Sequence, residues 1–116
     1  MSPSDRPEES GGEAQIARVK RGSLYVPAAL HERYFAGLST VILLRRDDHL
    51  LVMPVHDAAA GGYLLKIRNP AGDRVVDAMD FFRDQGLDDF FEAEFGVAWN
   101  GDHAALVAEN LFENAN

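Results

Sequence analysis

Apolar residues along the chain fall into short runs separated by polar or glycine-rich turns, and this pattern predicts a structure built mainly of β-strands. Residues 41–44 are continuously apolar, which is typical of a strand buried on both faces. A polar turn at 45–48 and a second apolar run at 50–55 complete a predicted hairpin. Tyr63, Leu65 and Ile67 share one face of a further predicted strand. Residues 92–97 alternate between apolar side chains and glutamate or glycine, as a half-buried strand does. Shorter strands are expected at 23–26 and 74–76.

Two short helices are predicted, and each ends at a Gly-Leu pair. Pro27 suits the first turn of the earlier helix, because the N–H that proline lacks would have no helical partner there. Gly37 is placed to end that helix in the left-handed conformation, and Gly86 does the same for the later helix. Asp77 is the predicted N-cap of the later helix, with Asp80 in its first turn, where the helix dipole favours acids.

Two turns between these elements have a recognisable chemistry. Residues 69–73 read Asn-Pro-Ala-Gly-Asp, in which proline fixes one φ angle and glycine accepts a positive one. Residues 100–102 read Asn-Gly-Asp, which is typical of a tight hairpin turn. Residues 104–108 then fit a second hairpin strand, but they equally fit a short helix capped by Asp102. The sequence leaves both alternatives open.

A strand–helix–hairpin unit occurs twice along the chain. Residues 26–38 and 75–87 align without gaps and share Val, Ala, Gly and Leu at equivalent positions, and each copy continues as strand, polar turn and strand. One unit has too few strands to bury its apolar face, whereas two units packed together do. We therefore expect a β-rich α+β fold, with two strand–short helix–β-hairpin halves at about 18–56 and 63–109 forming a small pseudo-twofold barrel or sandwich. The alternative is two unrelated strand–helix junctions in an ordinary α+β domain.

Length and composition indicate a single globular domain over residues 15–112. The chain has 116 residues and no cysteine, which excludes disulfides and thiolate chemistry. No apolar run approaches the roughly 20 residues of a membrane helix, and the N-terminus lacks the apolar core of a secretory signal, so a cytoplasmic protein is expected. Residues 1–14 are expected to form a disordered acidic arm, 57–62 a flexible connection and 113–116 a frayed tail.

The net charge of −8 is distributed unevenly. Residues 14–83 hold ten bases and seven acids, whereas residues 84–116 hold eight acids and no base. Lys66 and Arg68 share one face of a predicted strand and Arg74 faces them across the turn, an arrangement suited to phosphate binding. The alternative is a solvated hairpin whose bases pair with neighbouring aspartates. The candidate nucleic-acid-binding residues are Lys20, Arg21, Arg33, Lys66, Arg68 and Arg74.

Motifs for metal, nucleotide or nucleophilic chemistry are missing from the sequence. Gly61-Gly62 lacks the spacing and the Lys-Ser/Thr of a phosphate loop, and no serine lies in a Gly-x-Ser-x-Gly turn. The histidines are not spaced as a helical ligand pair and are interpreted as surface residues. We therefore expect no enzyme activity, no cofactor and no metal site. The four histidines are His31, His49, His56 and His103.

Aromatic and acidic residues in the C-terminal half could bind a protein partner. An acidic strand face beside exposed aromatic side chains would provide both charge and anchors for such an interface. The alternative is that the aromatic residues form the core, with Phe82 and Phe90 as the expected core members. The candidate partner-binding residues are Phe81, Phe91, Glu92, Glu94 and Trp99.

Both halves share a pattern of glycines, apolar positions and a short helix that contains an arginine. The first runs from Gly22 through Ser-Leu-Tyr-Val-Pro to a short helix with Arg33, then through Gly37-Leu38 to a hairpin. The second begins at Gly72-Asp-Arg and reaches Gly86-Leu87 before its own hairpin. Over residues 18–109 this pattern resembles the swapped-hairpin proteins of the AbrB and MraZ group. A tandem of two such halves in one chain is what MraZ-type members have.

The resemblance implies transcription regulators or antitoxins that bind DNA through arginines near the hairpin entry and in the short helix. It also implies dimers or rings, so a homodimer or a higher oligomer is expected. We accordingly predict a small non-enzymatic regulatory protein that binds DNA. The alternative is an accessory or assembly protein that binds a protein partner through its acidic C-terminal half, without binding DNA.

Overall fold

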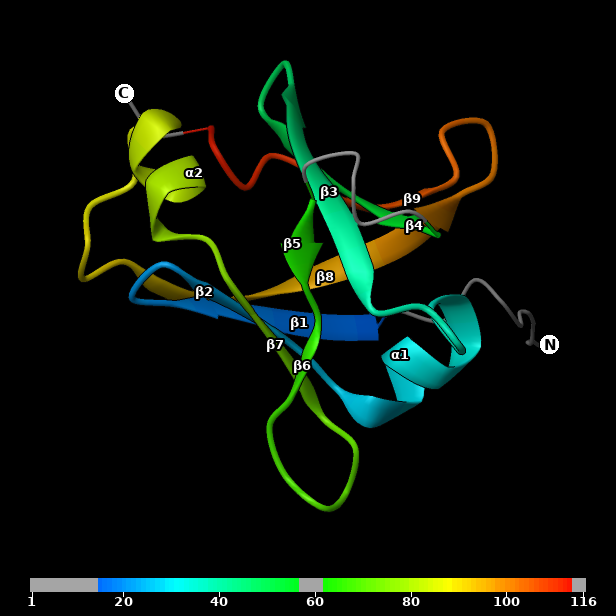
Figure 1. The fold of residues 1–116 in the computed structure, drawn as a ribbon. Helices are drawn as coiled ribbons and strands as arrows, with labels where there is room; N and C mark the ends of the chain where they lie inside the picture. The colour runs from blue at the N-terminus through cyan, green and yellow to red at the C-terminus, as the bar shows by residue number, and fades with distance from the viewer. Residues whose placement is uncertain (1–14, 57–61, 114–116) are drawn as a thin grey trace, which may run out of the picture.

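Nearly half of the described chain is strand, and the strands curl into one nearly closed antiparallel barrel with two short helices outside it (Figure 1). The computed structural model describes residues 15–56 and 62–113. The predicted arm at 1–14, most of the predicted connection at 57–62 and nearly all of the predicted tail lie outside these residues. The elements are β1 (Gln15–Lys20), β2 (Ser23–Val26), α1 (Ala28–Tyr34), β3 (Thr40–Arg46), β4 (His49–Val55), β5 (Tyr63–Leu64), β6 (Lys66–Ile67), β7 (Arg74–Asp77), α2 (Met79–Asp84), β8 (Glu92–Asn100) and β9 (Ala105–Ala108).

One stretch of chain, residues 63–67, joins the two ends of the sheet. The strand order is β5-β3-β4-β9-β8-β1-β2-β7-β6, so β5 and β6 lie at opposite ends although they are neighbours in sequence. The strand predicted at 63–67 is interrupted at Leu65, whose side chain is buried. Before this residue the stretch pairs with β3, and after it the stretch pairs with β7. The single stretch thereby nearly closes the barrel.

Equivalent strand pairings recur in the two halves, which confirms the predicted fold class. β1 pairs with β2 and with β8. The 63–67 stretch pairs in the corresponding way with β7 and with β3. Two further pairs, β2 with β7 and β4 with β9, join one half to the other. Because every half supplies strands to the other, neither half has a complete sheet of its own.

The helix ends agree with the sequence at the glycines but not at Asp77. Gly37 and Gly86 have φ angles of 78° and 89°, the left-handed conformation predicted for them. The N-cap position of α2 is occupied by Ala78, so the prediction of an Asp77 cap is wrong. Asp77 instead continues β7 opposite Ser23, whose hydroxyl donates to its carboxylate at 2.8 Å. Strand pairing with β2 therefore directs this side chain out of the sheet rather than over the helix.

Two other local predictions are settled by the sheet. Residues 105–108 form strand β9, which resolves the choice between strand and helix after the hairpin turn. The residue with a positive φ angle in that turn is Ala104 at 50°. The expectation that residues 41–44 are buried on both faces is wrong, because β3 alternates: Val41 and Leu43 are buried, whereas Leu44 is exposed on the outer face.

One aromatic residue that the sequence places in the core lies outside it. Phe82 is buried as predicted, whereas Phe90 is 78% exposed. Phe90 belongs to the loop between α2 and β8, where its N–H donates to the Asp88 carboxylate at 2.6 Å. This local turn keeps the ring at the surface. The interior is filled instead by other aromatic residues, with Phe35 and Phe112 both fully buried.

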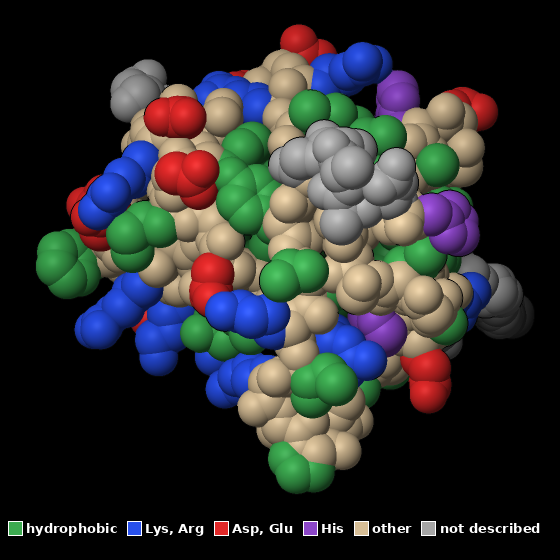
Figure 2. All heavy atoms as spheres, viewed as in Figure 1, with side chains coloured by type: hydrophobic (Ala, Val, Ile, Leu, Met, Phe, Trp, Pro, Cys, Tyr) green, Lys and Arg blue, Asp and Glu red, His purple; other side chains and the backbone are tan. Residues whose placement is uncertain are grey.

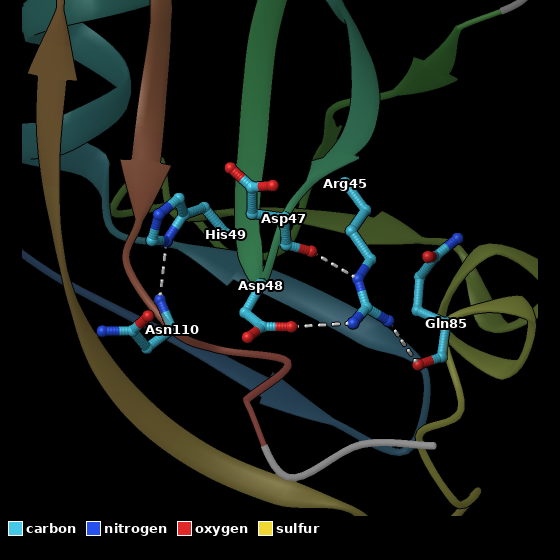
Figure 3. Close-up of polar contacts among 6 residues, drawn as sticks. All are labelled: Arg45, Asp47, Asp48, His49, Gln85 and Asn110. Atoms are coloured by element: carbon cyan, nitrogen blue, oxygen red, sulfur yellow. Dashed lines mark hydrogen bonds and ion pairs between the residues drawn. The ribbon is translucent and has the colours of Figure 1, made fainter.

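Polar contacts connect the β3–β4 hairpin to the end of α2 and to the C-terminal segment (Figure 3). Arg45 donates to the Asp48 carboxylate at 2.9 Å and to the Gln85 carbonyl at 3.2 Å, which joins β3 to the end of α2. Nδ1 of His49 accepts the N–H of Asn110 at 3.0 Å. These side chains have partners within the fold, so we assign the cluster a structural role.

Two glycines with nearly the same φ angle provide a test of packing against the β1–β2 turn. Gly22 has a φ of 80°, and a Cβ there would lie 2.7 Å from the Cβ of Met79. Gly37 has a φ of 78° with no atom within 4 Å of the corresponding position. We expect Gly37→Ala to cost about 1–2 kcal/mol of unfolding free energy for the left-handed backbone alone. Gly22→Ala should cost about 1–3 kcal/mol more because α2 must also move. Urea unfolding of both variants measures the difference, and equal losses would show that α2 does not pack closely on this turn.

Candidate nucleic-acid interface

A groove of about 300 Å³ lies where β1, β2 and the β6–β7 hairpin meet. Three arginines line it together with one tyrosine: one from β1, one from the residue after β6 and one from the start of β7. Two carboxylates also lie along its wall. Figure 2 shows lysine and arginine side chains gathered over the part of the molecule where Figure 1 places β1, β2, β6 and β7. The charged and aromatic residues of the groove are Arg18, Arg68, Arg74, Tyr25, Asp73 and Glu94.

Tyr25 lies between two guanidinium groups. Alternation along β2 buries Leu24 and Val26 and leaves Tyr25 on the outer face. Cζ of Arg18, from the paired position on β1, lies 5.3 Å from the centroid of the Tyr25 ring. Cζ of Arg68, from the β6 side of the sheet, lies 4.9 Å from the same centroid. Both distances fall within the range of cation–π attraction, which positions the guanidinium groups while leaving N–H donors for a ligand.

The third arginine is positioned by the turn between β6 and β7. Arg74 donates from Nη1 to the Gly72 carbonyl at 2.8 Å, within a turn in which Gly72 has the predicted positive φ angle. Asp73 accepts hydrogen bonds from the Asn69 amide at 2.9 Å and from the N–H of Ala28 at 2.8 Å. The Asn69 bond, followed by the Ala28 bond, lowers the pKa of Asp73. This carboxylate is therefore ionised at neutral pH and ties the turn to the start of α1.

The predicted trio of Lys66, Arg68 and Arg74 is only partly assembled. Nζ of Lys66 forms an ion pair with Asp77 at 2.6 Å. The hydrogen bond from Lys66, followed by that from Ser23, lowers the pKa of Asp77. For Lys66 the alternative of a base paired with a neighbouring aspartate is correct. Arg68 and Arg74 do share the groove, although Arg68 projects from the residue after β6.

The remaining predicted bases lie outside the groove lining. Lys20 occupies β1 two residues beyond Arg18, and therefore on the same face of that strand. Arg21 is exposed in the β1–β2 turn with a φ of 52°. Arg33 belongs to α1, where its Cζ lies 5.4 Å from the centroid of the Tyr34 ring. Lys20 and Arg21 lie together at the end of β1, and Arg33 lies on α1, so none of the three belongs to the groove lining.

Arg18 and Tyr25 were missed by sequence reasoning, although a signal for them existed. Residues 15–20 alternate between outward and inward side chains, and the two-residue turn at Arg21-Gly22 fixes the register of β1 against β2. That register places Arg18 opposite Tyr25. Recognition of the first hairpin would therefore have predicted the pair.

The aromatic residues predicted to bind a partner pack against the core instead. Phe81, Phe91 and Trp99 are all partly buried against it. The Trp99 ring stacks on Tyr34 with ring centroids 5.0 Å apart and an interplanar angle of 5°. The two acidic candidates are exposed on the outer face of β8. Of these, Glu92 pairs in register with Lys20, and Glu94 pairs in register with Arg18 and lines the groove.

One of the four histidines is buried rather than at the surface. His31 is buried against the Leu38 carbonyl, with Nε2 and the carbonyl oxygen 3.3 Å apart, so its interpretation as a surface histidine is wrong. Within 15–56 and 62–113, no group of three or more His, Asp or Glu side chains is arranged to hold a metal ion. Neither helix in this part of the chain has the length and apolar character needed to cross a membrane.

Comparison of the chain with protein-family models, curated proteins and solved structures returned no match. A function is therefore inferred from the groove and from the residues that line it.

Proposed function

We propose that the protein is a non-enzymatic, DNA-binding regulator or antitoxin-like protein that holds the phosphate backbone of duplex DNA in the groove around Tyr25. The observation that supports this most strongly is the convergence of Arg18, Arg68 and Arg74 on one groove. Guanidinium groups bind phosphate oxygens through two parallel hydrogen bonds, and stacking on an aromatic ring leaves their edges free for this contact. Neutralisation of phosphates by such groups provides most of the non-specific affinity for DNA.

The resemblance to swapped-hairpin proteins supports the same proposal. In that group, arginines near the hairpin entry contact DNA. Arg74 follows Gly72 at this place in the second half, whereas Ser23 holds the corresponding place in the first. The first half instead supplies Arg18 from the preceding strand.

Glu94 limits where a phosphate group lies in the groove. Its carboxylate lines the same wall as Arg18 and would repel a phosphate brought close to it. Phosphates bound by Arg18, Arg68 and Arg74 are therefore expected on the sides of these guanidinium groups that lie away from Glu94. Loss of this repulsion should tighten DNA binding, whereas a basic protein partner would be bound less tightly after the same change.

A salt titration tests the proposed function. Binding of the full chain to a mixed-sequence duplex is measured by fluorescence anisotropy as the salt concentration is varied. Three phosphate contacts predict that the logarithm of the association constant falls with the logarithm of the salt concentration with a slope of about −3. No binding at low salt would show that the proposal is incorrect.

A second proposal, an accessory protein that binds a protein partner, is supported by the exposed ring of Phe90. This residue follows Asp88 and Asp89 and could anchor a basic partner against the acidic half of the chain. Affinity capture from native extract should then recover a stoichiometric partner with the wild-type protein and lose it with Phe90→Ala. Recovery of the same proteins by both forms would contradict this second proposal.

A further inference from the structure

The tip of the β6–β7 hairpin presents apolar side chains to solvent. Ile67 is 70% exposed, and Pro70 and Ala71 are also exposed. Figure 1 shows this hairpin extending away from the barrel, and Figure 2 shows apolar side chains at its end. Exposure of this kind at a projecting tip is unlike an isolated apolar residue on a flat surface, because a partner can surround it.

Hydrogen bonds hold the tip in one conformation. The Asn69 amide donates to the Asp73 carboxylate at 2.9 Å, and the Asp73 N–H donates back to the Asn69 side-chain oxygen at 3.2 Å. The Gly72 N–H donates to the Asn69 carbonyl at 3.0 Å. The Asp73 carboxylate also accepts the N–H of Ala28, the first residue of α1. The apolar side chains are therefore preorganised at a fixed distance from the barrel.

Two guanidinium groups lie beside Ile67. Arg74 pairs with Ile67 in register, and Arg68 follows Ile67 with its guanidinium over Tyr25, so both arginines line the groove described above. An apolar tip with cations beside it matches the minor groove of duplex DNA, where stacked bases lie between two phosphate strands. Isoleucine and proline are among the side chains that proteins insert between base steps.

A membrane surface fits these features less well. Attachment to a bilayer by surface insertion depends on the apolar area buried and on attraction to anionic lipids. Ile67, Pro70 and Ala71 offer only a small apolar area for such attachment. Insertion between two base pairs requires only one or two side chains, so the observations favour DNA.

We propose that the β6–β7 tip enters the minor groove of duplex DNA and that Ile67 and Pro70 insert between base steps and kink the duplex. This inference rests on the proposed DNA-binding function and extends it to the shape of the bound DNA. The arginines of the groove position the duplex, and the rigid tip separates the bases. Partial unstacking of a base step is unfavourable, and the additional contacts of a bent duplex offset it.

Fluorescence energy transfer between the two ends of a short duplex tests the inference. The wild-type protein at low salt should shorten the end-to-end distance, as a kink of at least about 20° would do. Ile67→Ser and the double variant Ile67→Ser/Pro70→Ser should abolish the shortening while anisotropy still reports binding. Leu64→Ser is the matched control, because Leu64 is also an exposed apolar residue of the 63–67 stretch but lies in β5, away from the tip. This control should bend DNA as the wild type does.

The outcomes separate the two proposals. DNA binding by the wild type without bending, or bending that survives in the Ile67 variants, would overturn the inference and leave the proposed function standing. Absence of DNA binding would overturn both. Binding of the wild type to anionic phospholipid vesicles that is lost in Ile67→Ser would also overturn the inference, in favour of a lipid surface. Unchanged thermal unfolding of each variant establishes that the fold is retained.

Discussion

Replacing Phe112 by alanine is expected to lower the free energy of unfolding by about 3–5 kcal/mol. Phe112 is fully buried although it lies beyond the last strand of the barrel. Its ring centroid lies 6.3 Å from that of Phe81, and Cζ of Arg45 lies 5.1 Å from it. Its N–H also donates to the Asp48 carbonyl at 3.0 Å. Truncation would remove this ring from the interior and loosen the C-terminal segment together with the β3–β4 turn.

Phe90→Ala provides the matched control, because it makes the same chemical change at a ring that is 78% exposed. Phe90→Ala is expected to change the free energy of unfolding by no more than about 0.5 kcal/mol, as most surface substitutions do. Chemical denaturation of the two variants and the wild type gives both values. Similar losses for Phe112→Ala and Phe90→Ala would contradict the assignment of Phe112 to the core.

Removal of Arg18 and Arg68 together is expected to weaken DNA binding by about 60-fold at 0.1 M salt, because each neutralised phosphate contributes a factor of about 8 there. The slope of the salt dependence should become shallower by about 2. These residues are chosen because their guanidinium groups both contact Tyr25 in the groove. The measurement is the anisotropy titration of the double alanine variant against the wild type.

A double alanine variant of Arg33 and Arg46 changes the net charge equally and serves as the control, since neither residue lines the groove. It should lose much less affinity. A separate Glu94→Gln variant should bind DNA more tightly, because it removes the carboxylate that faces Arg18. Equal losses for the two arginine pairs would show that the affinity comes from overall charge and not from the groove.

Much of the architecture follows from local sequence signals. The short apolar runs predicted the hairpins, and Gly37 and Gly86 predicted the helix ends. Each of these signals depends on only a few neighbouring residues. The repeated unit then predicted two halves packed together, since one half alone leaves its apolar face uncovered. These predictions depend only on what each segment must bury.

The sequence was less informative about features that depend on contacts between residues far apart in the chain. Phe90 and Phe112 are equally apolar, and only the closure of the barrel decides which ring is inside. Asp77 has the chemistry of a helix cap, but pairing of β7 with β2 directs it to Ser23 instead. The guanidinium groups around Tyr25 come from residues far apart in sequence, so the groove depends on strand register rather than on a motif.

Mapping the DNA contacts by nuclear magnetic resonance tests most directly whether the groove is the interface. The ¹⁵N-labelled full-length protein is titrated with a short duplex, and the shift of each backbone amide is followed. The largest changes are expected at Arg18, at Tyr25 and along residues 68–74. Changes confined to the β3–β4 hairpin or to the loop around Phe90, with none at Tyr25, would contradict the proposed interface.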